Sequence, residues 1–156
     1  MMDINHAYNY CIKLLSIKDR TTAELRKKLK EKMFPDDIIG ETLNKLTDYG
    51  YINDERFTEN WIKSKANQSG ISKKYMYNKL LQKGIEKELI DNVFKKINID
   101  DYVSAFIFAQ KKIKLLNDDD KTKKNKLFTI LARKGYNIEL CKKVIKDIFE
   151  SDDSYQ

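Results

Sequence analysis

The chain has 156 residues, 41% of them apolar and 35% charged, with one proline, five glycines and a net charge of +7. This length and apolar content exclude disorder along the whole chain, and the few turn residues exclude a fold of many short strands. The positive charge favours an acidic partner, most often nucleic acid, while the lack of a run of about 20 apolar residues excludes a membrane-spanning helix.

Apolar residues recur with helical spacing along the chain, which predicts an all-α fold. Thr21, with Glu24 three residues later, has the form of a capping box that begins a helix, and Ser72 is the expected cap of a later one. Taken in chain order, the predicted helices cover residues 4–16, 21–32, 36–48, 54–67, 72–83, 86–97, 101–116, 121–133 and 137–149.

One pattern of apolar residues occurs three times at an offset of 51 residues. Seven positions are apolar in all three copies, and an eighth is lysine throughout. Each copy contains three helices and buries only a small core by itself, so neighbouring copies should pack against each other. We therefore expect three tandem three-helix repeats of about 51 residues that form an elongated, curved array. The copies cover residues 1–52, 53–103 and 104–156.

Glycine follows the second helix of two copies, as Gly84 and Gly135, where a helix C-terminus favours a residue that tolerates positive φ. Met33 occupies the equivalent position of the first copy and lacks that tolerance, so the first turn is expected to differ. The opening helices of the second and third copies should also begin at an N-cap. The candidate caps are Asn53 or Asp54, and Asp100 or Asp101.

Three segments carry distinctive motifs: DRTTAELRKKL at residues 19–29, LTDYGYINDERF at 46–57 and LLQKGI at 80–85. Together they resemble the RecX family of bacterial recombination regulators, with departures at Met33 and Thr58, where the family has glycine and alanine. The resemblance covers the first two copies well and the third mainly through its helix pattern. It implies three tandem three-helix units and a protein that binds the RecA recombinase filament on single-stranded DNA. Such a protein bridges successive protomers and suppresses ATP hydrolysis and strand exchange.

Basic residues concentrate on the middle helix of each copy, and the copies carry nine, ten and twelve basic residues against eight acidic residues each. If the copies stack in register, these side chains form a positive stripe suited to phosphates or an acidic groove, and the last copy is the expected place for nucleic-acid contact. For any single lysine, a solvated face whose stems cover the edge of the core is the simpler explanation. The candidate binding residues are Arg26, Lys28, Lys32, Arg56, Lys73, Lys74, Lys79, Lys83, Lys121, Lys123, Lys124, Lys126 and Lys134.

Other residue types that often carry chemistry have structural explanations. His6 aligns with phenylalanine in the other two copies, so we expect it to lie in or near the core. Cys11 and Cys141 align with isoleucine, which predicts small apolar core residues, and two cysteines without a disulfide framework fit a reducing cytoplasm. Capping and solvation explain the acidic run 118–120 better than a metal site does.

Aromatic residues flank the junction between the first two copies. Tyr49 and Tyr51 are expected to pack this joint on either side of Gly50. Arg56 belongs to a helix start and Trp61 to a half-buried helix face, and for both residues a structural role is favoured over direct contact with a partner.

The sequence offers no support for catalysis, because it has no nucleophile at motif spacing from a base, no glycine-rich phosphate loop and no paired metal ligands. We expect a cytoplasmic monomer without cofactors that regulates the recombinase filament and binds single-stranded DNA weakly and without sequence preference. The alternative is a stand-alone DNA-binding module of tandem helix-turn-helix-like units, transcriptional or architectural, with a helix in the major groove.

Overall fold

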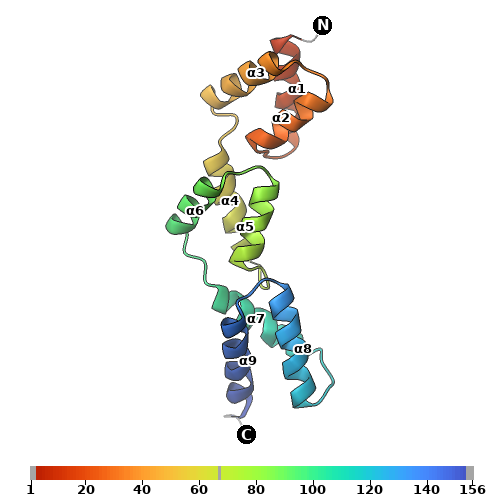
Figure 1. The fold of residues 1–156 in the computed structure, drawn as a ribbon, viewed down its shortest axis with the longest axis vertical. Helices are drawn as coiled ribbons and strands as arrows, with labels where there is room; N and C mark the ends of the chain where they lie inside the picture. The colour runs from red at the N-terminus through yellow and green to blue at the C-terminus, as the bar shows by residue number, and fades with distance from the viewer. Residues whose placement is uncertain (1–2, 67, 154–156) are drawn as a thin grey trace. The chain divides into compact units, whose positions relative to one another are not determined.

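The computed structural model describes residues 3–66 and 68–153. Within those residues every regular element is an α-helix, and the helices follow one another from α1 to α9 as three successive groups of three (Figure 1). The prediction of an all-α fold is confirmed. The helices are α1 Ile4–Ile17, α2 Thr22–Glu31, α3 Asp36–Asp48, α4 Asp54–Ala66, α5 Lys73–Gln82, α6 Lys87–Lys96, α7 Asp101–Ile113, α8 Asp120–Arg133 and α9 Ile138–Asp153.

The predicted helix starts agree with the observed starts to within one residue. Two C-termini differ more. The seventh helix ends at Ile113 rather than at residue 116, before the turn-forming run of Asn and Asp, and α9 continues to Asp153 because no glycine or proline interrupts it. The expected end of the fourth helix at residue 67 lies outside the described residues.

The backbone divides into two compact units. Unit 1 comprises Met1–Trp61 with Lys79–Lys96, and unit 2 comprises Ile62–Asn78 with Ile97–Gln156. The division runs through α4 and α5, so the middle group of three helices contributes to both units. The copy boundaries after residues 52 and 103 describe the repeat in the sequence and remain a proposal.

In unit 1 the first three helices enclose a small apolar core, with α3 packed against both α1 and α2. Cys11 is fully buried in this core, as predicted, and burial raises the pKa of its thiol to about 11. The thiol therefore stays protonated near neutral pH and acts as a small apolar side chain. The buried residues are Ala7, Cys11, Leu25, Leu29, Ile39, Leu43, Leu46 and Ile52.

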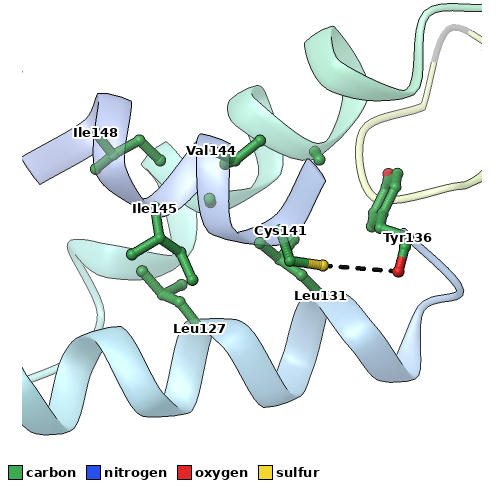
Figure 2. Packing of buried hydrophobic residues seen from close by; sticks show 9 residues of the cluster. Leu127, Leu131, Tyr136, Cys141, Val144, Ile145 and Ile148 are labelled. Atoms are coloured by element: carbon green, nitrogen blue, oxygen red, sulfur yellow. Dashed lines mark hydrogen bonds between the residues drawn. The ribbon is translucent and has the colours of Figure 1, made fainter. Parts of the chain in front are cut away.

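In unit 2 the helices α7, α8 and α9 pack around a second core. Leu127 and Leu131, one turn apart on α8, point toward Ile145 and Cys141 of α9 (Figure 2). The thiol of Cys141 is fully buried and lies 3.6 Å from the carbonyl oxygen of Tyr136, to which it donates a weak hydrogen bond. Burial also raises the pKa of the Cys141 thiol, so both cysteines occupy core positions, as the sequence predicts.

The opening helices bury small residues at equivalent positions. Ala7 of α1, Thr58 of α4 and Ala109 of α7 lie 51 residues apart and are all fully buried. The hydroxyl of Thr58 donates a hydrogen bond to the carbonyl oxygen of Asp54 at 2.7 Å, so its polar group is satisfied within the helix. Small side chains at this position bring the opening helix close to its neighbours.

His6 is exposed, and the prediction that it lies in or near the core is wrong. Its side chain is 62% exposed, and Nδ1 lies 2.8 Å from a carboxylate oxygen of Asp3, the N-cap of α1. Hydrogen bonds from His6 lower the pKa of that carboxyl. The core-facing position is the next one along the helix, Ala7, so the alignment was right and the inferred face was one residue away.

The three second helices end in the same turn. Met33, Gly84 and Gly135 have φ values of 67°, 82° and 93°, and in each case the residue after them donates its backbone N–H to a carbonyl five residues earlier. The expectation that the first turn differs is therefore wrong. The hydrogen bonds are Phe34 to Leu29 at 3.2 Å, Ile85 to Leu80 at 3.1 Å and Tyr136 to Leu131 at 3.3 Å.

Candidate partner and nucleic-acid interface

The three sequence motifs meet at one place in unit 1, where the start of α2 contacts the end of α5. Thr21 is fully buried, and its hydroxyl donates a hydrogen bond to the carbonyl oxygen of Lys83 at 2.7 Å. The same hydroxyl accepts from the backbone N–H of Glu24 at 3.1 Å and completes the predicted capping box. One side chain therefore caps its own helix and binds a helix terminus 62 residues away.

Asp54, the first residue of α4, contacts the same end of α2. Its carboxylate accepts hydrogen bonds from the backbone N–H of Thr22 at 2.9 Å and from the Thr22 hydroxyl at 3.1 Å. A negative charge at the N-terminus of α2 is also favoured by the helix dipole. A Cβ atom at Gly84 would overlap the Cβ of Ala23, so this glycine is required by close approach as well as by its positive φ. We call this set of contacts joint 1.

Unit 2 contains an equivalent set of contacts, joint 2, at the start of α5 and the end of α8. The hydroxyl of Ser72 donates to the carbonyl oxygen of Lys134 at 2.7 Å, and both residues lie 51 positions after Thr21 and Lys83. The carboxylate of Asp101, the first residue of α7, accepts from the backbone N–H of Lys73 at 3.0 Å. A Cβ atom on Gly135 would lie 2.8 Å from the Ser72 hydroxyl oxygen. The motif residues thus build the joints in each unit.

The remaining caps are settled by hydrogen bonds. Asn53, not Asp54, caps α4 by accepting from the backbone N–H of Arg56 at 3.0 Å. Asp100, not Asp101, caps α7 by accepting from Tyr102 at 3.0 Å. In each pair the next residue, Asp54 or Asp101, does not cap its own helix, and its carboxylate contacts the second helix in the joint.

The lysine that is shared by all three copies has a structural contact each time. Its ammonium group lies over an aromatic ring of the opening helix of its own copy, in the geometry of a cation–π interaction. In the first copy, where histidine replaces phenylalanine, the lysine uses a tyrosine one turn further along α1. The distances from Nζ to the ring centroid are 5.6 Å for Lys32 and Tyr10, 5.8 Å for Lys83 and Phe57, and 4.6 Å for Lys134 and Phe108.

Further predicted binding residues also have partners within the chain. Lys79 takes part in an interaction as well, and the Lys73 ammonium acts on the Asp101 carboxylate electrostatically. Such contacts reduce, without abolishing, the availability of these cations for a ligand. The other partners are Glu31 for Lys28 at 3.9 Å, the Gly50 carbonyl for Arg56 at 3.1 Å, Asp118 for Lys126 at 2.8 Å and the Phe149 ring for Lys124 at 4.9 Å.

Four of the predicted residues have side chains without a hydrogen bond, ion pair or ring contact to any described residue: Arg26, Lys74, Lys121 and Lys123. All four lie in the first half of a second helix, on α2, α5 or α8. Arg26, Lys74 and Lys121 are exposed, and Lys123 is partly buried. These cations are the ones most available to an acidic ligand.

A shallow groove lies on the surface of α8, and the charge pattern of the sequence does not predict it. It is lined along one helix face, with residues at spacings of three and four, and it combines two cations with hydroxyl and amide groups. Arg133 is the basic residue missing from the predicted set, and its position seven residues after Lys126 is the helical signal that indicates it. The lining residues are Thr122, Asn125, Lys126, Thr129, Ile130 and Arg133.

The acidic run before α8 has the capping role that the sequence predicts. Asp119 accepts a hydrogen bond from the backbone N–H of Thr122 at 2.9 Å, and hydrogen bonds from Thr122 lower the pKa of the Asp119 carboxyl. In the part of the chain that the structure describes, no group of three or more His, Cys, Asp or Glu side chains could hold a metal ion. None of the described helices has the length and hydropathy to cross a bilayer.

Tyr49 and Tyr51 form an aromatic cluster within the first copy. Their rings meet Tyr8 of α1 edge-on, at centroid distances of 6.5 and 6.3 Å, and Lys45 lies over the Tyr8 ring at 4.8 Å. Both tyrosines stay more than half exposed. Tyr51 also lines a small hollow together with Asn53, Arg56 and Phe57, so packing at the junction between the first two copies stays a prediction. Trp61 is partly buried, as expected, and the choice between joint packing and partner contact stays a prediction.

Family models place the whole repeat in one family. The first, second and third three-helix domains of RecX match residues 7–46, 53–93 and 100–145, in that order. The regulatory protein RecX of Mycolicibacterium vanbaalenii is 35% identical over 135 residues, which cover 81% of this chain and 73% of the relative. The regulatory protein RecX of Chlorobium phaeobacteroides is 29% identical and is matched over 97% of its length.

Solved structures agree with this assignment. The crystal structure of RecX from Lactobacillus salivarius superposes with a TM-score of 0.81 at 26% identity, covering 93% of this chain and 96% of that one. A second crystal structure of a regulatory protein RecX, 24% identical and with a TM-score of 0.81, shares the fold. The chain belongs to the RecX family of regulatory proteins.

Proposed function

We propose that this protein regulates the RecA recombinase by binding the filament that RecA forms on single-stranded DNA, mainly inhibiting its ATPase and strand exchange in recombination and DNA repair. The observation that carries the proposal is the ordered match to all three RecX domains from residue 7 to residue 145. The protein would act without cofactors, as a cytoplasmic monomer, and direct binding to single-stranded DNA would be weak and independent of sequence.

The unpartnered cations supply a physical basis for contact with phosphates or with an acidic groove. Lys121 and Lys123 lie on α8 in unit 2, and Arg26 lies on α2 in unit 1. Charges that make no contact within the protein lose little by pairing with a ligand, whereas Lys83 and Lys134 would have to leave an aromatic ring. The full candidate set stays as predicted, with these unpartnered residues expected to contribute most.

The second candidate function is a stand-alone DNA-binding module that reads duplex DNA through α8. The groove along this helix favours it, because Asn125 and Arg133 are residue types that hydrogen-bond base edges, and the threonine hydroxyls can do so too. A sequence-specific reader would prefer one duplex by roughly a thousand-fold or more, whereas a filament regulator would bind DNA weakly and without sequence preference. Titration of labelled duplex and single strand at several salt concentrations distinguishes the two.

The decisive experiment measures ATP hydrolysis by a bacterial RecA on single-stranded DNA as this protein is added. Inhibition at a stoichiometric excess is expected. The double variant Lys121→Glu with Lys123→Glu should need about tenfold more protein for half-inhibition, which corresponds to about 1.4 kcal/mol. Unchanged ATPase with the wild-type protein would contradict the proposed function.

A matched control changes the same amount of charge on another helix. Lys142 and Lys146 of α9 are exposed and pair only loosely, at 3.6 Å with Glu139 and 4.0 Å with Glu150. The double variant Lys142→Glu with Lys146→Glu should inhibit nearly as well as the wild type. Equal losses for both double variants would indicate that net charge, rather than the position of α8, governs binding.

A further inference from the structure

The helix α7 carries apolar side chains on a face that the core of unit 2 does not use. Ala105 and Ala109 are fully buried, whereas Val103 and Ile107, one turn apart, remain 48% and 39% exposed. The positions equivalent to Ile107 hold Asn5 and Arg56 in the other two copies. The aliphatic side chain of Ile107 is therefore particular to α7, whereas the counterpart of Val103, 51 residues earlier, is Ile52, which is buried.

Two surface hollows of unit 2, with volumes of about 280 and 520 Å³, adjoin the aliphatic ridge of Val103 and Ile107: Ile107 lines both, and Val103 lines the smaller one. Ile107 and Lys111 line both hollows, so the two hollows adjoin at these side chains of α7. We call the two hollows together the α7 groove. Its aliphatic and aromatic lining comes from Ile71, Ile99, Val103, Phe106, Ile107, Ile113 and Ile148.

Among the described side chains that line the α7 groove, the charge that is not used to cap a helix is positive. Lys111 and Lys114 line it toward the C-terminal end of the helix, and neither makes an ion pair with a described residue. Asp100, at the opposite end, uses its carboxylate to cap α7. An occupant therefore meets an aliphatic surface at one end and two available ammonium groups at the other.

We propose that the α7 groove binds an acidic, amphipathic segment of a protein partner, with apolar side chains on the Val103–Ile107 ridge and carboxylates beside Lys111 and Lys114. The inference rests on the proposed function and deepens it, because the segment would belong to the recombinase filament. Burial of the ridge supplies apolar contact, and charge complementarity fixes the direction of the segment.

Other occupants fit the α7 groove less well. Nucleic-acid bases stack on aromatic rings or guanidinium planes, and the ridge is aliphatic. A second copy of this chain, seated ridge against ridge with the two α7 helices parallel, would bring Lys111 and Lys114 toward their own counterparts, and like charges repel. An antiparallel pair avoids this repulsion and would appear as a concentration-dependent dimer of the protein alone. The sequence that follows Ser151, DDSYQ, is acidic and starts beside a residue that lines the groove. The test therefore includes an outcome in which this segment, and not a partner, occupies the groove.

The test uses two substitutions at one residue of the ridge. Ile107→Glu and Ile107→Lys both remove the aliphatic side chain, but only glutamate repels an acidic partner. Binding of the 156-residue protein to RecA filaments on fluorescent single-stranded DNA is followed by anisotropy. We expect Ile107→Glu to weaken binding tenfold or more and Ile107→Lys to weaken it by about threefold at most.

A matched control and a second variant keep the result interpretable. Ile138 is 56% exposed at the start of α9 and does not line the groove, so Ile138→Glu should bind like the wild type. If Ile107→Glu lowers the melting temperature, the double variant Lys111→Glu with Lys114→Glu replaces it and should show the same tenfold loss. Equal binding by Ile107→Glu and the wild type overturns the inference, and equal losses for the glutamate and lysine variants overturn the acidic character of the partner.

Failure of the proposed function gives a different result. If the wild type neither binds the filament nor lowers its ATPase, the function itself is wrong. If the wild type binds, Ile107→Glu binds equally, and a chain shortened to end at Ser151 binds more tightly, then the α7 groove holds this chain's own C-terminal segment and not a partner.

Discussion

Joint 1 and joint 2 use the same backbone contact with different side chains around it. In both, a hydroxyl at the N-cap of a second helix reaches the carbonyl of the shared lysine at 2.7 Å. The acidic partner differs: the Asp54 carboxylate accepts hydrogen bonds from both the backbone N–H and the hydroxyl of Thr22, whereas the Asp101 carboxylate accepts only from the backbone N–H of Lys73. The two acids do not align in the repeat, because Asp101 lies one helical turn earlier than the counterpart of Asp54.

The backbone contact is the same in both joints, while the side chains around it differ. Joint 2 adds Ser104, whose hydroxyl lies 2.6 Å from the phenolic oxygen of Tyr136 and donates to the carbonyl of Ile71 at 3.3 Å. Burial raises the pKa of the Asp101 carboxyl, so keeping this carboxylate charged in joint 2 costs some electrostatic free energy. The two joints should therefore respond differently to substitution and to pH.

The largest effect is expected from Gly84→Ala in joint 1. The new methyl group would meet the Cβ of Ala23 at a backbone φ of 82°, so strain and overpacking together should cost roughly 3 kcal/mol. Gly50→Ala is the matched control, since Gly50 has φ of 76° with nothing within 4 Å of an added Cβ, and it should cost only about 1 kcal/mol. Urea unfolding measures both, and equal losses would show that close approach at joint 1 is unimportant.

Removal of the shared hydroxyl should have the next largest effect. Thr21→Val keeps the shape of the side chain but loses the N-cap and leaves the Lys83 carbonyl without its donor, at a cost of roughly 2 kcal/mol. Ser72→Ala should cost a similar amount in joint 2. Asp119→Ala removes a cap that makes no joint, so a smaller loss of stability is expected in the same urea measurement. A loss for Thr21→Val no larger than that for Asp119→Ala would count against the joint.

Neutralising the shared lysine should have a smaller effect. Lys83→Met and Lys134→Met keep most of the stem but remove the charge above Phe57 and Phe108, which should cost about 0.5–1 kcal/mol. Lys121→Met lacks such a ring and should leave the thermal unfolding midpoint unchanged. A drop for Lys121→Met as large as for Lys134→Met would contradict the structural role of the shared lysine.

The smallest effects concern pH. The raised pKa of Asp101 means that the folded protein binds a proton before the unfolded chain does, so acidification through that pKa toward 3.8 stabilises unit 2. Asp101→Asn removes this gain, and its stability relative to the wild type should be highest at neutral pH and fall on acidification. The pKa of Asp119 is lowered from 3.8, so its contribution is present above 3.8 and lost below it.

Asp119→Asn should therefore change the pH dependence of stability in the opposite direction, within the same unit. It should be less stable than the wild type at neutral pH, and the difference should shrink only as the pH falls below about 3.8. Urea unfolding of both variants between pH 7 and pH 3 checks the two trends. Parallel curves for Asp101→Asn and Asp119→Asn would show that burial of Asp101 does not affect its titration.

The sequence predicts the helices and the repeat because both depend on spacing along the chain. Leu29, Leu80 and Leu131 are identified as core residues by periodicity alone, and all are fully buried. Equivalence between copies does not specify which side of a helix faces inward, so the alignment of His6 with phenylalanine predicts a core position although Ala7 is the buried residue. Met33 shows the opposite case, because the surrounding hydrogen bonds impose a positive φ on a residue that does not prefer it.

The candidate interface was harder to predict for a different reason. Whether a lysine is available depends on its neighbours in space, and the ring under Lys134 comes from a residue 26 positions earlier in the chain. The same holds for Thr21 and Lys83, which are separated by 62 residues. A one-dimensional charge pattern therefore predicts which helices are basic but cannot separate the engaged cations from the available ones.

The division between the units runs through α4 and α5, and this has a consequence for how the chain could be dissected. A fragment that stops at residue 52 would retain Thr21 and Thr22 but lose their acceptors, the Lys83 carbonyl and the Asp54 carboxylate. Limited proteolysis or expression of single copies should therefore yield poorly folded pieces. The length that is repeated in this chain is shorter than the length that can hold itself together.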